Sequence, residues 1–376
     1  MRLRMLTCVA AALPLAAAHA IEAPKQQTDA SAAAPVPQAT VTPTDEAAFY
    51  VRLQRVTHWR QLRDLNVPQA VIDDLARGAV DRAVATLSEA AAQGQEEANI
   101  ALVRVQHWCS RIGATPPRDL RQQIDQLASV LPPERVARAA GVLQAEAAFS
   151  EGAARSCRNA RFDYEAIEDR LRDAADLGKP ASATELARFV RDPRKRDALL
   201  EKAAKQQYAP AMYALATRRV IEVQRGERTS DIASIRSYLK HAGRTMPQAK
   251  VDLANCMALG CDGHPADSSS AQAFGIDAAR DGEPSAFLSM VRMPWGRRMP
   301  RAQLLAWQYF GDRLNEAGCM GDAYIAHARS FAQAITLLTR DADEQVIAQA
   351  REQAERLWAQ NARRAMREQG CGEPEP

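Results

Sequence analysis

The sequence predicts an all-α protein, built as a right-handed αα-superhelix (solenoid) of helix–turn–helix repeats with helical caps. Three observations predict this class. Alanine, the residue with the highest helix propensity, is frequent, while aromatic residues make up only 5% of the chain. The period-two alternation that is typical of strands is nearly absent. One spaced pattern of leucine, alanine and glycine recurs along the chain, as it does in repeat proteins.

The first twenty residues are typical of a secretory signal peptide. A positively charged start precedes an apolar stretch, and the small-x-small tripeptide Ala18-His19-Ala20 follows it. We therefore expect cleavage near Ala20 and a periplasmic or secreted mature protein. The apolar stretch is too short for stable membrane insertion. An apolar N-terminal helix of a cytosolic protein remains the alternative. Cys8 lies inside the apolar stretch, which argues against a lipid anchor.

Four regions follow from the composition. Residues 1–20 form the signal peptide, and residues 21–44 form a linker rich in proline and alanine that buries little surface. Helical periodicity runs over residues 45–370, which we assign to the solenoid. Residues 371–376 form a flexible tail.

The charge balance argues against nucleic acid as the main partner. Loss of Arg2 and Arg4 with the signal peptide lowers the formal net charge from +3 to about +1. Phosphate binding needs a basic surface, and the basic clusters in the mature chain are short. These clusters are typical of solvated helix faces or loops.

An even number of cysteines remains after cleavage, which favours disulfides in an exported chain. The six candidates are Cys109, Cys157, Cys256, Cys261, Cys319 and Cys371. Fifteen pairings are possible, and we expect pairing in chain order, with a local bond between Cys256 and Cys261. Six separate buried thiols are the alternative.

The recurring pattern has a bulky residue at the start and alanines three and four positions later. A glycine follows at +7, an alanine at +11 and a large apolar residue at +15. Its defining positions are Leu87, Gly94 and Leu102; Leu171, Gly178 and Leu186; Leu200, Ala211 and Leu215; and Gly282 and Ala286 in a copy that starts at Gly275. A degenerate copy starts at Tyr238. Gln207 and Thr245 replace the glycine, and Ser182 replaces an alanine.

The spacing predicts two antiparallel helices joined by a tight turn. Positions 0, +3 and +4 share one helical face, and the glycine suits the left-handed conformation that ends a helix. Positions +11 and +15 share a face of the next helix. Because one pair cannot bury its outer face alone, the pairs are expected to stack.

This pattern resembles the Sel-one-like repeat family, a relative of the tetratricopeptide repeat with a period of about 36 residues. The clearest repeats cover about residues 80–110 and 161–292. The resemblance implies a helical solenoid that acts as an adaptor for other proteins. Some cysteine-rich relatives bind or hydrolyse β-lactams and carry a cysteine pair in each repeat. The copies at Leu171 and Leu200 have no cysteine, so this chain departs from that pattern.

Helices outside the repeats fit the same architecture. Residues 45–57 and 68–77 are expected to form an N-terminal pair, and the double prolines at 116–117 and 132–133 mark two further helix starts. An apolar stripe from Val346 to Met366 predicts a last helix that ends at Gly370 and caps the solenoid. A partner-binding helix is the alternative.

Two groups of residues in the sequence are candidates for a metal or catalytic site. Cys256, Cys261 and His264 could hold a metal, but a disulfide beside a loop histidine explains them more simply. Ser237 and Lys240 spell the S-x-x-K of penicillin-interacting enzymes, without the accompanying motifs. We therefore predict no catalytic, metal or cofactor site.

Trp295 lies in a loop after the fourth copy, either as a partner anchor or as a lid over the solenoid edge. The main functional expectation is an exported scaffold that binds a protein or peptide. A β-lactam-interacting protein and a structural protein of the cell envelope are the alternatives.

Overall fold

A computed structural model describes residues 59, 62, 65–114, 119–227, 232–261, 263–320 and 324–371. The expected signal peptide, linker and first helix at 45–57 lie outside these residues, as does most of the tail. The described residues form helices and turns without strands, as the sequence predicts. The helices are α2 Gln69–Ala76, α3 Val80–Ala92, α4 Glu96–Ala114, α5 Leu120–Ala128, α6 Pro133–Asn159, α7 Tyr164–Asp176, α8 Pro180–Leu186, α9 Pro193–Lys205, α10 Ala209–Gln224, α11 Ser234–Ala242, α12 Pro247–Leu259, α13 Ser268–Arg280, α14 Pro284–Arg292, η2 Gly296–Arg298, α15 Arg301–Glu316, α16 Tyr324–Thr339 and α17 Glu344–Gln369.

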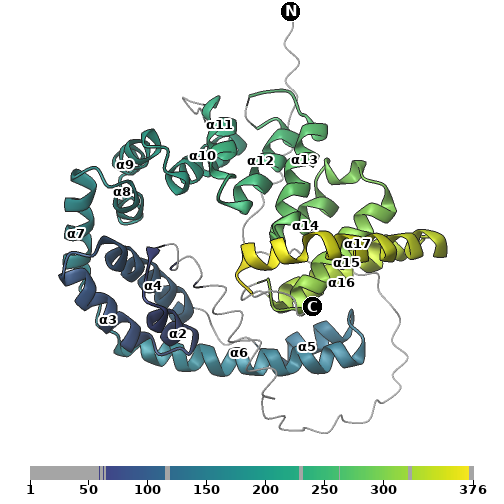
Figure 1. The fold of residues 1–376 in the computed structure, drawn as a ribbon, viewed down its shortest axis with the longest axis horizontal. Helices are drawn as coiled ribbons and strands as arrows, with labels where there is room; N and C mark the ends of the chain where they lie inside the picture. The colour runs from purple at the N-terminus through teal and green to yellow at the C-terminus, as the bar shows by residue number, and fades with distance from the viewer. Residues whose placement is uncertain are drawn as a thin grey trace, which may run out of the picture.

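The repeat pattern marks helix pairs that stack in a row. The pairs are α3/α4, α7/α8, α9/α10, α11/α12 and α13/α14, and each packs against the next. The large apolar positions of the pattern are buried, including Leu87, Leu171 and Leu200 on first helices and Leu102 and Leu215 on second helices. The row bends into an arc (Figure 1), with the second helix of each pair on its inner side.

The turn position behaves as its spacing predicts. Gly94, Gly178 and Gly282 have positive φ angles of 85°, 89° and 75°, where a side chain is strained. Gln207, which replaces the glycine in the third pair, keeps the left-handed conformation with φ of 59°. The left-handed turn is therefore retained at Gln207, whereas Thr245, which replaces the glycine in the fourth pair, does not have a positive φ.

The bulky residue that is missing at Gly275 is supplied by Trp295. A Cβ atom at Gly275 would lie 2.3 Å from the Trp295 ring, so the indole occupies the place of the leucine found in other copies. Trp295 has 0% exposure, and its Nε1 donates a hydrogen bond to Asn255 Oδ1 at 3.1 Å. The interpretation of Trp295 as an exposed partner anchor is thus wrong, and it serves as an internal lid.

Helices α5 and α6 leave the row, and we call this pair the arm. Helix α7 packs directly on α4 and continues the row, so the arm is an insertion between the first two pairs. Helix α6 has 27 residues and a length of about 40 Å. In Figure 1 it runs along the open side of the arc, from α3 and α4 toward α15 and α16. The arm thereby closes the arc into a ring-shaped outline.

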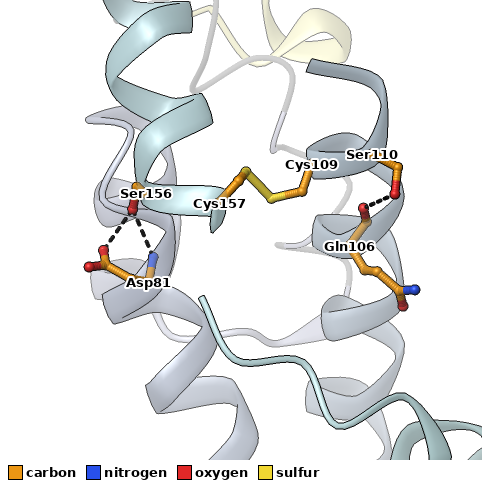
Figure 2. Close-up of a disulfide and its surroundings, with 6 residues drawn as sticks. All are labelled: Asp81, Gln106, Cys109, Ser110, Ser156 and Cys157. Atoms are coloured by element: carbon orange, nitrogen blue, oxygen red, sulfur yellow. Dashed lines mark hydrogen bonds between the residues drawn. A yellow bond between two sulfur atoms is a disulfide. The ribbon is translucent and has the colours of Figure 1, made fainter. Parts of the chain in front are cut away.

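The six cysteines form three disulfides in chain order: Cys109–Cys157, Cys256–Cys261 and Cys319–Cys371. The first joins α4 to the end of α6, with Cα atoms 5.6 Å apart, and closes the base of the arm (Figure 2). The third ties Cys371, the second residue after α17, to the turn after α15. Disulfides persist in oxidising compartments, so the three bonds indicate an environment outside the cytoplasm.

Helix α17 caps the last repeats. It packs along α15, and its Arg364 binds Asp277 of α13 and Asp281, the residue that caps the C-terminal end of α13, at 2.9 and 2.6 Å. Lys250 of α12 binds the same two carboxylates at 2.5 and 2.6 Å. This four-residue ion network locks the cap onto the stack. Among the described helices, none combines the length and apolar character needed to cross a bilayer.

Candidate functional site

The inner face of the arc is the candidate site. We define it as the surface formed by the second helices α4, α8, α10, α12 and α14 (Figure 1). The small residues at position +11, such as Ala211 and Ala286, are buried and let the helices of a pair approach closely. Polar side chains then remain to line the seams between neighbouring second helices.

One repeat position builds these seams. Position +14, just before the large apolar residue, carries Glu185, Asp252 and Ser289 in three copies. Each of them accepts a hydrogen bond from the preceding repeat. The bonds are Arg104 Nε to Glu185 Oε1 at 3.1 Å, Tyr213 Oη to Asp252 Oδ2 at 2.7 Å, and Asn255 Nδ2 to Ser289 Oγ at 3.2 Å. The same register therefore links successive repeats on the inner side.

The central seam extends into a longer chain of hydrogen bonds, which we call the Asp252 network. Gln248 Nε2 donates to Asp252 Oδ1 at 3.3 Å. Ser285 Oγ lies 2.8 Å from both Gln248 Oε1 and Glu283 Oε1. Together with Tyr213, these residues span α10, α12 and α14. The network fixes the relative positions of three repeats and leaves half-buried polar groups at the inner face.

Burial dominates the electrostatics of this network. It raises the pKa of Glu283, although Ser285 donates to this carboxylate, and it raises the pKa of Asp252 against the hydrogen bonds from Tyr213 and Gln248. Burial and the nearby Asp252 charge also raise the pKa of Tyr213. Two acidic groups in this network thus hold protons more strongly than exposed carboxylates do.

The polar groups of this network bond to one another across the repeats. The described part of the chain contains no group of three or more His, Cys, Asp or Glu side chains placed to hold a metal ion. Cys256 and Cys261 are bonded to each other, so they cannot act as thiolate ligands beside His264.

The S-x-x-K residues lie away from the inner face. Ser237 and Lys240 are exposed on α11, the first helix of its pair, and Ser237 Oγ donates to the Ser234 carbonyl at 2.9 Å. Sequence reasoning missed the Asp252 network, because single polar residues in an alanine-rich helix give no pattern by themselves. The recurrence of a polar residue at position +14 is the signal that could have found it.

The chain is similar to several solved structures, including the following two. One is a protective antigen present in uropathogenic Escherichia coli strains that displays an SLR fold, with 14% identity and a TM-score of 0.43 over 86% of this chain and 76% of that one. The other is a Sel1 repeat protein from Oxalobacter formigenes, with 18% identity and a TM-score of 0.37 over 86% and 94%. The chain resembles Sel1 repeat proteins. No protein-family model and no curated protein matches the sequence.

Proposed function

We propose that the protein is an exported scaffold that binds a protein or peptide segment on the inner face of the arc. The observation that carries the proposal is the recurrent polar seam, because it places half-buried donors and acceptors along one continuous curved surface. A curved stack of helix pairs suits an extended segment or a helix laid along it. We further propose a periplasmic or secreted location after cleavage near Ala20, with no nucleic acid and no catalysis in its role.

Site-specific photocrosslinking in cells tests the proposal. A photoreactive residue at Gln248 lies on the inner face, while the matched control at Ser237 lies exposed on α11. We expect a discrete crosslinked protein from position 248 and none from 237. The purified partner should then bind the wild-type chain saturably, and Gln248→Ala should weaken that binding.

Two results would contradict the scaffold proposal. Turnover of a chromogenic β-lactam that is lost in Ser237→Ala would favour the enzymatic alternative. Co-sedimentation with peptidoglycan, without any crosslink from position 248, would favour a structural protein of the envelope.

A further inference from the structure

The two ends of the arm are held by different kinds of contact. At its base, α6 packs closely against α3 and α4, and the Cys109–Cys157 disulfide joins α6 to α4 covalently. Ser156 Oγ also donates to Asp81 Oδ1 at 2.7 Å and accepts from the Asp81 N–H at 3.0 Å (Figure 2). The base is therefore fixed as long as the disulfide exists.

At the tip, long side chains make the contact with the C-terminal repeats. Arg135 of α6 binds both Asp312 oxygens, at 2.8 and 3.0 Å, and Glu316 at 2.6 Å. Arg138 adds a bond to the other Glu316 oxygen at 2.7 Å. We call these four side chains the latch. Among the described helices, α6 makes its most extensive close backbone approaches to α3, α4 and α5, and those to α15 and α16 are fewer.

The tip also makes an apolar contact with α16. The arm side carries larger side chains, and the α16 side consists of Tyr324, two alanines and the half-buried Ile325. The buried members are Leu127, Leu131, Ala139, Val142, Leu143 and Ala145 on the arm and Tyr324, Ala328 and Ala332 on α16. Because burial energy scales with the apolar area removed from water, alanines on one side limit the strength of this contact.

Burial of the latch side chains has an unfavourable desolvation free energy. Arg135 Nε is buried without a hydrogen-bond partner among the described residues. Burial also raises the pKa of Asp312 despite the adjacent Arg135 guanidinium. Desolvation of a half-buried ion pair can cancel much of its attraction. The tip is therefore held by non-covalent contacts whose net strength is reduced by desolvation, whereas the base has a covalent bond.

We propose that the arm is a releasable strut, whose tip detaches from α15 and α16 and loses protection there while its base stays anchored, so that the ring opens into an arc. The latch of Arg135, Arg138, Asp312 and Glu316 sets the balance between the two forms. Access of a partner to the inner face would follow this balance, a consequence that rests on the proposed function. The proposed release of the arm does not depend on the proposed function.

Hydrogen exchange and small-angle scattering of the purified full chain test the strut. Arg135→Gln removes the central cation, and we expect amides of α5 and of the first turns of α6 to exchange about tenfold faster. The radius of gyration should increase, while amides beside Cys157 and on α3 keep their wild-type rates. Arg138→Gln is the matched control, because Arg138 is 44% exposed, whereas Arg135 is 22% exposed and binds both Asp312 and Glu316; its effect should be smaller.

A second variant separates release from unfolding. Gln126→Cys with Arg329→Cys places two thiols where the side chains now share a hydrogen bond of 2.9 Å. A short bismaleimide between them should return the Arg135→Gln variant to the wild-type scattering profile. The strut is contradicted if Arg135→Gln leaves exchange and scattering unchanged, or if exchange rises equally at the base of the arm. Neither readout involves a partner, so failure here leaves the binding proposal standing.

Discussion

Single residues explain where the repeats depart from their own pattern. Gly275 replaces a leucine because the Trp295 indole fills its place, and Gln207 keeps a turn that glycine forms elsewhere. In both cases the backbone keeps the conformation of the repeat. Only the residue that fills the core position or forms the turn differs from the pattern. These exceptions give sharp tests of the packing.

Replacing Gln207 by glycine should stabilise the protein. The left-handed conformation costs a residue with a Cβ atom about 1 kcal/mol, and the Gln207 side chain is exposed. After the larger chain entropy of glycine is counted, we expect a gain of about 0.5 kcal/mol in the free energy of unfolding. Urea unfolding measures it. Gly178→Gln, the reverse change in open space at φ of 89°, should destabilise; equal effects of both variants would contradict the argument.

Adding one methyl group at Gly275 should destabilise the protein, although alanine normally favours a helix. The new Cβ atom would lie 2.3 Å from the Trp295 ring, and overpacking of this kind costs about 1–3 kcal/mol. Gly152→Ala in α6 is the matched control, because nothing lies within 4 Å of its Cβ position, and it should stabilise by about 0.5–1 kcal/mol. Thermal unfolding of both variants tests this prediction. A higher stability of Gly275→Ala than of the wild type would contradict the packing of Trp295 against Gly275.

At the scale of elements, helices far apart in sequence are joined by a few strong contacts. The Cys109–Cys157 bond spans a sequence separation of 48, and the Lys250–Asp277–Asp281–Arg364 network joins α12, α13 and α17. These contacts determine how the insertion and the cap are held.

Removing the Cys109–Cys157 bond by a double serine substitution should lower stability. Closing a loop of this length restricts the unfolded chain by about 4 kcal/mol in the entropic treatment. Denaturant unfolding should show a loss of about 2–4 kcal/mol. Hydrogen exchange should rise first at the base of the arm, near Ser156 and Asp81, where the wild-type bonds lie. A loss confined to α16 would contradict this assignment.

The cap should weaken in acid through Asp277. Burial alone would raise the pKa of Asp277, but hydrogen bonds from Lys250 and Arg364 outweigh it and hold the pKa below the ordinary value of 3.8. The stabilisation is therefore complete above pH 3.8 and is lost as the pH falls through the lowered pKa. The difference in unfolding free energy between wild type and Asp277→Asn, measured from pH 7 downward, should shrink below that point. A constant difference down to pH 2 would contradict it.

At the scale of the whole molecule, the sequence predicts the row of repeats better than its closure. The positions around Leu87, Leu171 and Leu200 recur with a fixed spacing, so local periodicity suffices to identify paired helices. Arg135 and Asp312 are 177 residues apart and belong to no repeat, so no spacing relates them. The seams of the inner face are predictable only in part. The polar residue at position +14 recurs with the repeat, but its hydrogen-bond partners differ from one repeat to the next.

The geometry at the base of the arm would allow the arm to be removed without interrupting the row of repeats. The chain leaves the row after α4 and returns after α6, and Cys109 and Cys157 in the last turns of these helices have Cα atoms 5.6 Å apart. Consecutive Cα atoms lie about 3.8 Å apart, so a graft of one or two residues could bridge that gap. Excision of the segment between the two cysteines would then give a shorter, uninterrupted solenoid in which one side of α4 is exposed. A different helical hairpin could be inserted at the same two positions.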